Sequence, residues 1–354
     1  MREQEQIKVL MIGPDRTVHG GISGVVNNYY EAGLDKKINL CYIGTMVEGS
    51  KFRKLVKAIT SFLIFSLKVS GYQIVHVNMA SDSSYYRKSL FIKTAKFFGK
   101  KIVIHQHGGD FEGFYYSELD DEGRKNVDRV LSMGDSFLVL APAWKKFFGN
   151  IVEADKIVVL PDAIRIPKAE KKEYGQLKLL FLGRLCREKG IGELLEILLE
   201  LKKSYPNIHL FLGGIWEDRS LKEEAEKLEE SVTWLGWVSG EEKKKYLCEC
   251  DIFVLPSYFE GQSVAVLEAM AYGCAIVASE TGGIPQMISH EQTGILIKPK
   301  NTGALKQGLE KVLADAELCR RLGTNARRKV QNEFSIEDNM EKLLQIYRKV
   351  LMKP

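Results

Sequence analysis

The sequence predicts an α/β protein made of two Rossmann-like domains, each built on a doubly wound parallel sheet, that face a common cleft. Short apolar segments typical of buried strands alternate with longer segments of helical spacing, and this alternation runs twice along the chain. A charged, proline-containing stretch at residues 166–176 separates the two runs and is predicted to be a linker. The length of 354 residues suits two domains of about 150 residues each.

The domain boundaries follow from the same patterns. We expect an N-terminal domain over residues 1–165 and a C-terminal domain over residues 177–335. The last segment, residues 336–354, has helical spacing and is expected to join the N-terminal domain. Strands are predicted at residues 7–12, 38–43, 73–77, 101–105, 136–140, 157–160, 177–182, 208–212, 232–235, 252–255 and 275–278.

The composition is that of a soluble globular protein, with 45% hydrophobic and 27% charged residues. The six cysteines show no C-x-x-C and no metal-binding spacing, which suits reduced thiols in the cytoplasm. The polar first residues lead directly into a strand, so we expect no signal peptide. The longest strongly apolar stretch, residues 59–67, is far shorter than the ~20 residues that span a bilayer. The expected location is therefore the cytoplasm.

Positive charge is concentrated in the first half of the chain. Residues 36–101 contain thirteen Lys and Arg against two acidic residues, which leaves a local charge of +11. Three interpretations stay open: a solvated basic surface, attraction to an anionic membrane such as the inner face of the plasma membrane, or attraction to a phosphate-bearing substrate. Nucleic acid is not an expected partner, because no binding motif or aromatic stacking platform accompanies the charge.

Residues 51–68, within this basic region, form a predicted amphipathic helix. Basic residues crowd its first half, and its apolar residues share one broad face. We expect this face to pack on the core, as most such stripes do, with contact to a membrane surface as the alternative. The apolar residues of the face are Phe52, Leu55, Val56, Ile59, Phe62 and Leu63.

Two loops of the N-terminal domain carry candidate ligand-binding residues. Gly20 and Gly21 lie between the first strand and a helix, where glycine lets a phosphate approach the backbone. A dinucleotide-binding site is disfavoured, because G-x-G-x-x-G and an acid after the next strand are both missing. His107 follows another strand beside glycines, with Asp110 close by. This histidine is placed either to reach a ligand or to pack and cap locally.

Two carboxylates in the C-terminal domain lie eight residues apart in different settings. Glu260 is on the loop beyond the strand at 252–255, and Glu268 is about one turn inside the helix that begins near Val264. Ligands of open α/β sheets bind in the crevice at the carboxyl ends of the strands, and a helix start attracts anions. The pair therefore indicates a ligand site, although an exposed loop and an ordinary helix surface would also account for it.

The order of several motifs along the chain adds support for a ligand site. Gly183-Arg184-Leu185 comes first with Lys189-Gly190, and the two glutamates and Thr281-Gly282-Gly283-Ile284-Pro285 follow, behind an N-terminal domain with a glycine pair. Together these motifs resemble the retaining glycosyltransferases of family 4, the group 1 glycosyltransferases, which have the GT-B fold. The resemblance covers nearly the whole chain and is strongest over residues 177–299.

The resemblance implies a role for each matching residue. Arg184 and Lys189 would bind the diphosphate of a nucleotide-sugar donor, Glu268 the ribose hydroxyls, and Glu260 a hydroxyl of the sugar. His107 would lie near the reacting sugar, so His107, Glu260, Arg184 and Lys189 are the expected catalytic residues. The remaining implied donor-binding residues are Gly20, Gly21, Gly261, Gln262, Ser263 and Val264, with the base near Val238 and with Asp110 as an additional candidate.

The activity implied is retaining transfer of a sugar, with a UDP-sugar as the expected donor. The N-terminal domain would bind the acceptor, a saccharide or a lipid-diphosphate-linked saccharide in capsular, exo- or lipopolysaccharide biosynthesis. No Asp-x-Asp follows a strand, so we expect no cofactor and no metal ion. The chain departs from the family pattern at Ala141, at Gln286 and at Gln262-Ser263, and the last of these departures leaves the sugar open. The alternatives are a nucleotide-sugar epimerase of related fold and a non-catalytic basic membrane-binding module.

Overall fold

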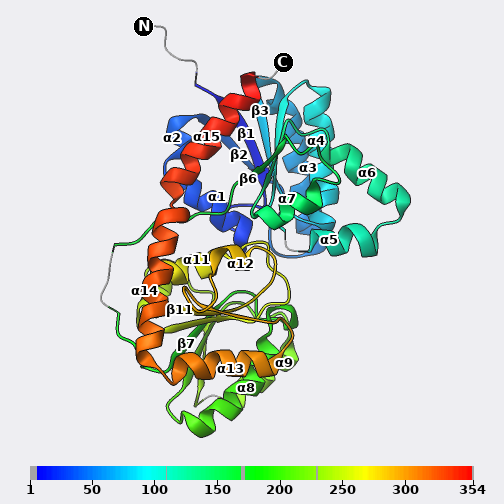
Figure 1. Ribbon diagram of the computed structural model, residues 1–354. Coiled ribbons are helices and arrows are strands. Elements are labelled where there is room, and N and C mark those ends of the chain that lie inside the picture. Colours follow the sequence, from blue (N-terminus) through cyan, green and yellow to red (C-terminus); the bar gives the residue numbers. More distant parts are fainter. Residues whose placement is uncertain (1–5, 109, 169–171, 229, 353–354) are drawn as a thin grey trace. The chain divides into compact units, whose positions relative to one another are not determined.

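The computed structural model describes residues 6–108, 110–168, 172–228 and 230–352, and the chain divides into two compact units (Figure 1). The N-terminal unit comprises residues 1–165 and 336–354, and the C-terminal unit comprises residues 166–335. Each unit contains a six-stranded sheet in which every strand is parallel to its neighbours. The predicted α/β class is thus confirmed in both halves of the chain.

The sheet of the N-terminal unit has the order β2-β1-β3-β4-β5-β6. Its inner strands β1, β3, β4 and β5 are buried on both faces, which is why they read as continuous apolar runs in the sequence. Each predicted strand agrees with the observed one to within two residues. The observed strands are β1 (Lys8–Gly13), β2 (Asn39–Gly44), β3 (Ile74–Met79), β4 (Lys101–Gln106), β5 (Ser136–Val139) and β6 (Ile157–Val159).

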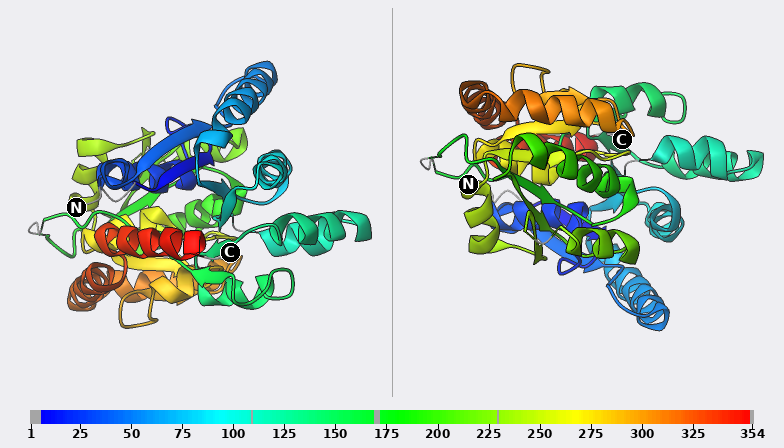
Figure 2. Two further views of the ribbon diagram at one scale, coloured as in Figure 1. Left: turned by 90° about the horizontal axis from the view of Figure 1, so that it is seen from above. Right: turned by 90° about the horizontal axis from the view of Figure 1, so that it is seen from below.

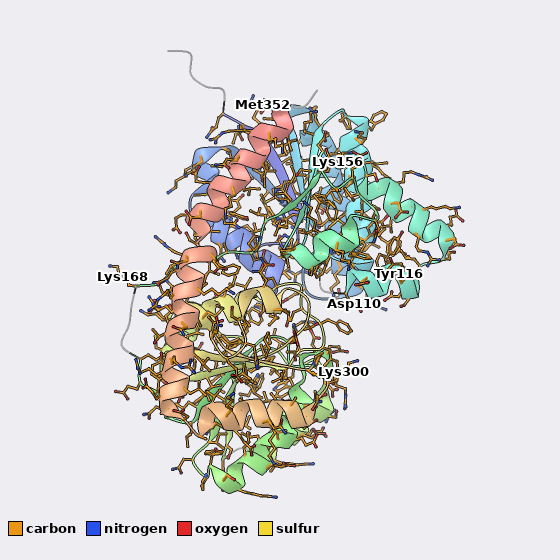
Figure 3. The ribbon with its side chains drawn as sticks, viewed as in Figure 1. Asp110, Tyr116, Lys156, Lys168, Lys300 and Met352 are labelled. Carbon is orange, nitrogen blue, oxygen red and sulfur yellow. The ribbon has the colours of Figure 1, made fainter. Side chains whose placement is uncertain are left out.

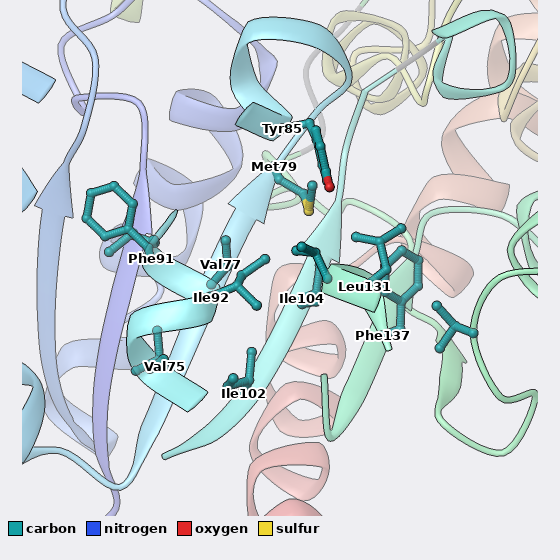
Figure 4. Close-up of a cluster of buried hydrophobic side chains, with 14 of the residues drawn as sticks. Val75, Val77, Met79, Tyr85, Phe91, Ile92, Ile102, Ile104, Leu131 and Phe137 are labelled. Atoms are coloured by element: carbon teal, nitrogen blue, oxygen red, sulfur yellow. The ribbon is translucent and has the colours of Figure 1, made fainter. Parts of the chain in front are cut away.

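Helices cover this sheet and complete its core. Figure 4 shows one side of the core, where Phe91 and Ile92 of α4 pack with buried side chains of β3 and β4 such as Val77 and Ile104. α15 returns from the end of the chain, and its Tyr347 hydroxyl lies 2.6 Å from Nδ1 of His76 in β3. The helices are α1 (Gly21–Glu31), α2 (Leu34–Lys37), α3 (Lys51–Lys68), α4 (Asp82–Phe97), α5 (Phe111–Gly113), α6 (Asp121–Leu131), α7 (Pro142–Phe148) and α15 (Ile336–Met352).

The sheet of the C-terminal unit has the order β12-β11-β10-β7-β8-β9. Its strands are β7 (Lys178–Leu182), β8 (His209–Gly213), β9 (Val232–Gly236), β10 (Ile252–Leu255), β11 (Ala275–Ser279) and β12 (Ile295–Ile297). β12 was not predicted from the sequence, although its three residues are all apolar. The helices are α8 (Ile191–Ser204), α9 (Arg219–Glu226), α10 (Gly240–Glu249), α11 (Val264–Ala271), α12 (Ile284–Met287), α13 (Thr302–Leu313) and α14 (Ala316–Glu333).

The predicted linker, residues 166–176, is counted with the C-terminal unit, and its residues 169–171 lie outside the described part. Lys172 donates to the carbonyl oxygen of Leu247 at 2.5 Å, and the Tyr174 hydroxyl donates to that of Gly273 at 2.9 Å. The next two backbone N–H groups donate to Asp251 at 2.9 and 2.8 Å. The described end of this segment is therefore held on the unit that follows it.

Helix α3 corrects one prediction. The apolar face expected to pack on the core is largely exposed: Phe52 is 75% exposed, and Leu55, Val56, Ile59 and Leu63 are also exposed. Of that face, Phe62 does pack against the core. The helix has the opposite orientation to the predicted one: Ser61 and Phe65, on the other side of the helix, are its buried residues. Among the helices of the described residues, none is both long and apolar enough to cross a membrane.

Candidate functional site

Each sheet has one point where the connections leave in opposite directions, and ligands of such sheets bind there, beyond the carboxyl ends of the strands. In the C-terminal unit this point lies between β7, which leads to β8, and its parallel neighbour β10, which leads to β11. The loop after β7 carries Arg184 and Lys189, and the loop after β10 carries Glu260. These three predicted residues thus come from the two loops at this point of the sheet.

Lys189 and Glu260 form a close ion pair across these loops. The Lys189 Nζ atom lies 2.5 Å from Oε1 of Glu260, and the two side chains are only 18% and 10% exposed. The loops are also joined by their backbones, since the Tyr258 N–H donates to the carbonyl oxygen of Glu188 at 2.8 Å. At Gly190, φ is +72°, and a Cβ would lie 2.3 Å from the carbonyl oxygen of Pro256, so only glycine fits.

The loop after β11 supports Glu260 from another side. The Gly283 N–H donates to the carbonyl oxygen of Gly261 at 2.9 Å. At Gly282, φ is +54°, and a Cβ would lie 1.5 Å from the carbonyl oxygen of Glu260. The Gly-Gly of the 281–285 motif is therefore required by the close approach of two loops. The sequence singled out this motif without assigning it this role.

Glu268 lies in α11, whose start is capped by Ser263. The Ser263 hydroxyl oxygen accepts from the Val266 N–H at 3.4 Å, which satisfies one free donor of the first turn. The Glu268 carboxylate is 2.6 Å from Nζ of Lys243 in α10, and both side chains are partly buried. Lys243 was missed, because it stands in a run of charged residues, 241–245, that reads as an ordinary helix surface.

The other predicted donor-binding residues of this unit lie around these pairs. Arg184 is paired with Glu217 at 2.9 Å, and its side chain is 55% exposed and so accessible to an anion. Gly261 is buried in the loop that precedes α11, and Gln262 is half-buried. Val238, beyond β9, is buried, and a Cβ on Gly213 would lie 3.0 Å from its side chain.

In the N-terminal unit the corresponding point lies between β1 and β3. Gly20 and Gly21 follow β1 at the start of α1, and an added Cβ would meet no atom within 4 Å at either residue. The packing of the chain itself therefore does not demand glycine here. The loop after β2 contacts the loop after β1, because Glu48 accepts a hydrogen bond from the His19 N–H at 3.0 Å.

His107 is held from both sides at the end of β4. Its Nδ1 lies 3.3 Å from Oδ1 of Asp162, and its Nε2 lies 3.0 Å from Oδ1 of Asn78. The side chains of His107 and Asp162 are only 3% and 4% exposed. The sequence predicted neither partner, although each lies at or just after the carboxyl end of a predicted strand. Their position at the ends of predicted strands was the signal in the sequence that could have identified them.

Two further histidines lie beside His107. The ring of His105 is 3.9 Å from that of His107 and 5.5 Å from that of His76, measured between centroids. Burial, reinforced by the nearby His107, lowers the pKa of His76 to about 3. Burial likewise lowers the pKa of His105 well below its usual range, with His107 and His76 adding to the effect. Both rings are therefore neutral at physiological pH.

Within the described residues, three groups could converge on a metal ion. These are His105, His107 and Asp162, whose ligand atoms lie within 4.8 Å of one another. Two imidazoles and one carboxylate suit zinc or iron. They do not suit magnesium, which prefers oxygen ligands and which commonly binds diphosphates. The set therefore does not fit the metal that would bridge a nucleotide diphosphate.

Asp110 lies apart from this cluster. Its side chain is exposed at the surface of the N-terminal unit (Figure 3), and Oδ1 accepts from the Gly113 N–H at 2.9 Å. It therefore caps the short helix α5. Gly109, which precedes it, lies outside the described residues.

Solved structures with the same architecture define the class. The sucrose-phosphate synthase of Thermosynechococcus elongatus matches with a TM-score of 0.77 at 20% identity, over 98% of this chain and 99% of that one. HepE from Anabaena, solved in complex with UDP, matches with a TM-score of 0.77 at 14% identity, over 97% of this chain and 100% of that one. With these neighbours and its two parallel sheets, the chain has the GT-B fold.

Sequence similarity to known proteins is concentrated in the C-terminal half. Residues 162–329 match the model of the glycosyl transferases group 1. The amylovoran biosynthesis glycosyltransferase AmsK of Erwinia amylovora is 30% identical over 251 residues, which are 67% of this chain and 61% of AmsK. An uncharacterised 41.2 kDa protein from the cps region of Klebsiella pneumoniae is 22% identical over 94% of this chain and 97% of its own length.

The length of the match differs between relatives. This chain spans only 44% of an uncharacterised glycosyltransferase of Methanocaldococcus jannaschii, to which it is 31% identical over 173 residues. It thus covers less than two thirds of that protein and of AmsK, and nearly all of the Klebsiella protein. The similarity to the group 1 glycosyltransferases is thus carried by residues 162–329, just under half of the chain.

Proposed function

We propose that the protein is a retaining, metal-independent glycosyltransferase. It moves a sugar from a nucleotide sugar, with a UDP-sugar as the expected donor, to a saccharide or a lipid-diphosphate-linked saccharide. The observation that carries the proposal is the close, partly buried ion pair of Lys189 and Glu260, in a segment of group 1 sequence. The pair lies at the switch point of the C-terminal sheet, where a ligand of this fold is bound.

The proposed roles in donor binding match the chemistry of the side chains. The ammonium of Lys189 and the accessible guanidinium of Arg184 bind the diphosphate, since both are permanent donors at neutral pH. Glu268 accepts from the ribose hydroxyls, and Glu260 from a hydroxyl of the sugar. The positive end of α11 adds to the attraction for the anion. The space beside Gly20 and Gly21 supports a phosphate contact there.

Transfer breaks the bond between the anomeric carbon and the phosphate oxygen. The acceptor oxygen forms its bond to the same carbon on the same face, and the acceptor proton passes to the departing phosphate. The diphosphate gains negative charge during this step, so Lys189 and Arg184 act most strongly in the transition state. Loss of one such donor is expected to cost on the order of 100-fold in rate. His107, held by Asp162, lies near the reacting sugar in this proposal.

The pathway is proposed from the relatives. AmsK is named for amylovoran biosynthesis, and the Klebsiella protein for its place in a cps region, so we propose a role in surface-polysaccharide assembly. All six cysteines are free thiols, which supports a cytoplasmic location.

The test is a panel of nucleotide sugars, with release of the nucleoside diphosphate as the readout. We expect one donor to be turned over, and Lys189→Ala to lower the rate about 100-fold. Glu268→Gln is expected to weaken UDP binding about 10-fold or more, because it loses a charged acceptor. Lys202→Met is the control, since Lys202 forms a surface pair with Glu230. Absence of turnover with every donor, together with unchanged UDP binding in both site variants, would overturn the proposal.

Two further readouts test its finer parts. Full activity in excess chelator is expected, and strict dependence on a metal ion would refute the metal-free step. The anomeric configuration of the product, read by NMR, is expected to match that of the donor. Conversion of the donor without any acceptor would instead indicate an epimerase.

A further inference from the structure

Helix α3 presents an apolar stripe to solvent. The large apolar residues Phe52, Leu55, Val56, Ile59, Leu63 and Leu67 are between 42% and 83% exposed. At about 100° per residue they fall within an arc of about 120°, directly opposite the buried Ser61 and Phe65. Figure 2 shows α3, in mid-blue, standing out from the edge of the N-terminal unit. A contiguous exposed stripe of this kind marks a binding surface.

The charges of α3 are all of one sign. Its 18 residues include Lys51, Arg53, Lys54, Lys57 and Lys68 and no acidic residue. Lys51 and Arg53 lie on the two flanks of the stripe, each about 100° from its centre. Lys57 is engaged with Asp15 at 2.9 Å. An apolar stripe with cations along its borders is the pattern of a helix that lies in the surface of an anionic membrane.

We propose that α3 docks the N-terminal unit on an anionic lipid surface. The helix lies in the plane of the membrane, with its stripe at the boundary of the acyl chains. Lys51 and Arg53 extend along the flanks, so that their charged ends reach the lipid headgroups. This inference does not depend on sugar transfer, because it requires only the exposed face of one helix.

The charge of α3 decides between a lipid surface and a second copy of the chain. If the same face packed on itself, Lys51 and Arg53 at the borders of one stripe would meet the same two cations of the other copy, with no acidic residue in the helix to oppose them. Such like charges repel one another. An anionic bilayer supplies both the opposite charge and the apolar interior. The whole region of residues 36–101, with thirteen basic and two acidic residues, adds attraction of the same sign.

The position of α3 would bring the membrane close to one edge of the sheet. A groove of about 550 Å³ runs between the first half of α3 and the loop after β1, and Phe52, Arg53 and Asp15 are among the residues that line it. That loop leads to Gly20 and Gly21. A bound bilayer would therefore lie beside the carboxyl ends of the strands of the N-terminal unit.

Vesicle flotation tests the proposal with the full-length protein. We expect binding to vesicles that contain phosphatidylglycerol, weaker binding to phosphatidylcholine alone, and partial release by salt. The double substitution Leu63→Gln/Leu67→Gln removes two exposed apolar side chains and is expected to lower partition about 100-fold. Lys51→Gln/Arg53→Gln is expected to lower binding to the anionic vesicles about 30-fold. Leu199→Gln is the control, since Leu199 of α8 is 53% exposed in the other unit.

Three results would overturn the proposal. The first is absence of binding by the unaltered protein at low salt, and the second is equal binding by the Leu63/Leu67 variant. The third is a dimer in analytical ultracentrifugation that this variant converts to monomer, which would assign the stripe to self-association. Leu63 and Leu67 are exposed, so thermal unfolding should not change. If that variant unfolds early, Lys51→Glu/Arg53→Glu must still lose binding to anionic vesicles, and retained binding would refute the proposal.

Discussion

Replacing Lys189 by methionine removes the cation that holds Glu260 and keeps most of the apolar stem. At the 2.5 Å separation, with an effective dielectric constant of about 20, two unit charges attract by about 7 kcal/mol. Desolvation of a pair that is only 18% and 10% exposed offsets most of this attraction. A charge-assisted hydrogen bond contributes about 1.5–3 kcal/mol net. We therefore expect Lys189→Met to destabilise the C-terminal unit by about 2–3 kcal/mol.

The assay is a double-mutant cycle with Glu260→Gln, read by urea unfolding. Tryptophan emission reports mainly the C-terminal unit, because Trp216, Trp234 and Trp237 lie there and only Trp144 lies in the other unit. The double variant should lose less stability than the sum of the single variants, with a coupling of about 2 kcal/mol.

The matched control is the pair of Arg184 and Glu217, which has a similar separation of 2.9 Å but side chains 55% and 45% exposed. Its coupling should stay below about 1 kcal/mol, because solvent screens it. Additive effects within about 0.5 kcal/mol for Lys189 and Glu260 would refute the reasoning.

Three other predictions concern single residues. Gly282→Ala should destabilise the C-terminal unit by more than ~1 kcal/mol in urea unfolding and should slow donor turnover, because the added Cβ would collide with the loop that carries Glu260. Gly303→Ala is the control and should change neither quantity, because the nearest atom to its added Cβ would be 3.5 Å away. His76, whose pKa is lowered to about 3, contributes its full stability above pH 6.5. The unfolded chain takes up this proton first as the pH falls, so His76 alone lowers the free energy of unfolding by about 1.4 kcal/mol per pH unit below 6.5. His76→Gln should remove this part of the pH dependence measured by urea unfolding, while the part due to His105 stays. Asp162→Asn should lower kcat/KM at least ~10-fold while UDP affinity, read by calorimetry, stays unchanged, because it releases the ring of His107. Unchanged kcat/KM would contradict this role.

Most strands could be predicted from the sequence because both sheets are parallel and their inner strands are buried on both faces, which makes each inner strand an apolar run. β12 was missed, although Ile295, Leu296 and Ile297 form a short apolar run like that of the predicted strand β6. The orientation of α3 could not be predicted either. An amphipathic pattern shows that one face is apolar, but it does not show whether that face meets the protein or the solvent. Only the burial of Ser61 and Phe65 decides this.

The candidate site, too, could be predicted from the sequence only in part. Glu260 and Lys189 could be placed from the sequence, because each lies on a loop at the carboxyl end of a predicted strand. Their direct contact could not, since it depends on the order in which β7 and β10 pair. Lys243 gave no signal, because lysines in charged helical runs are common. Asp162 did leave a signal in the sequence, because it is an acidic residue that directly follows a predicted strand and a proline.

The ion pair of Lys189 and Glu260 constrains how the donor can bind. A carboxylate has about four acceptor sites, and an ammonium has three donors. Lys189 can therefore bind Glu260 and a phosphate oxygen together, and Glu260 can accept from Lys189 and from a sugar hydroxyl. The pair does not need to break when the donor binds. The carboxylate nevertheless offsets the positive charge that a diphosphate meets.

Glu260→Gln should therefore strengthen binding of UDP, which carries no sugar, while it slows sugar transfer. Removing a charge that opposes the anion favours UDP by about 1 kcal/mol in a partly exposed site, or about 5-fold in affinity. Turnover loses a charge-assisted contact to the sugar and should fall about 10-fold or more. Calorimetry with UDP and steady-state kinetics with the donor measure the two effects separately. Weaker binding of UDP by this variant would show that Glu260 chiefly orients Lys189 for the phosphate and does not hold the sugar.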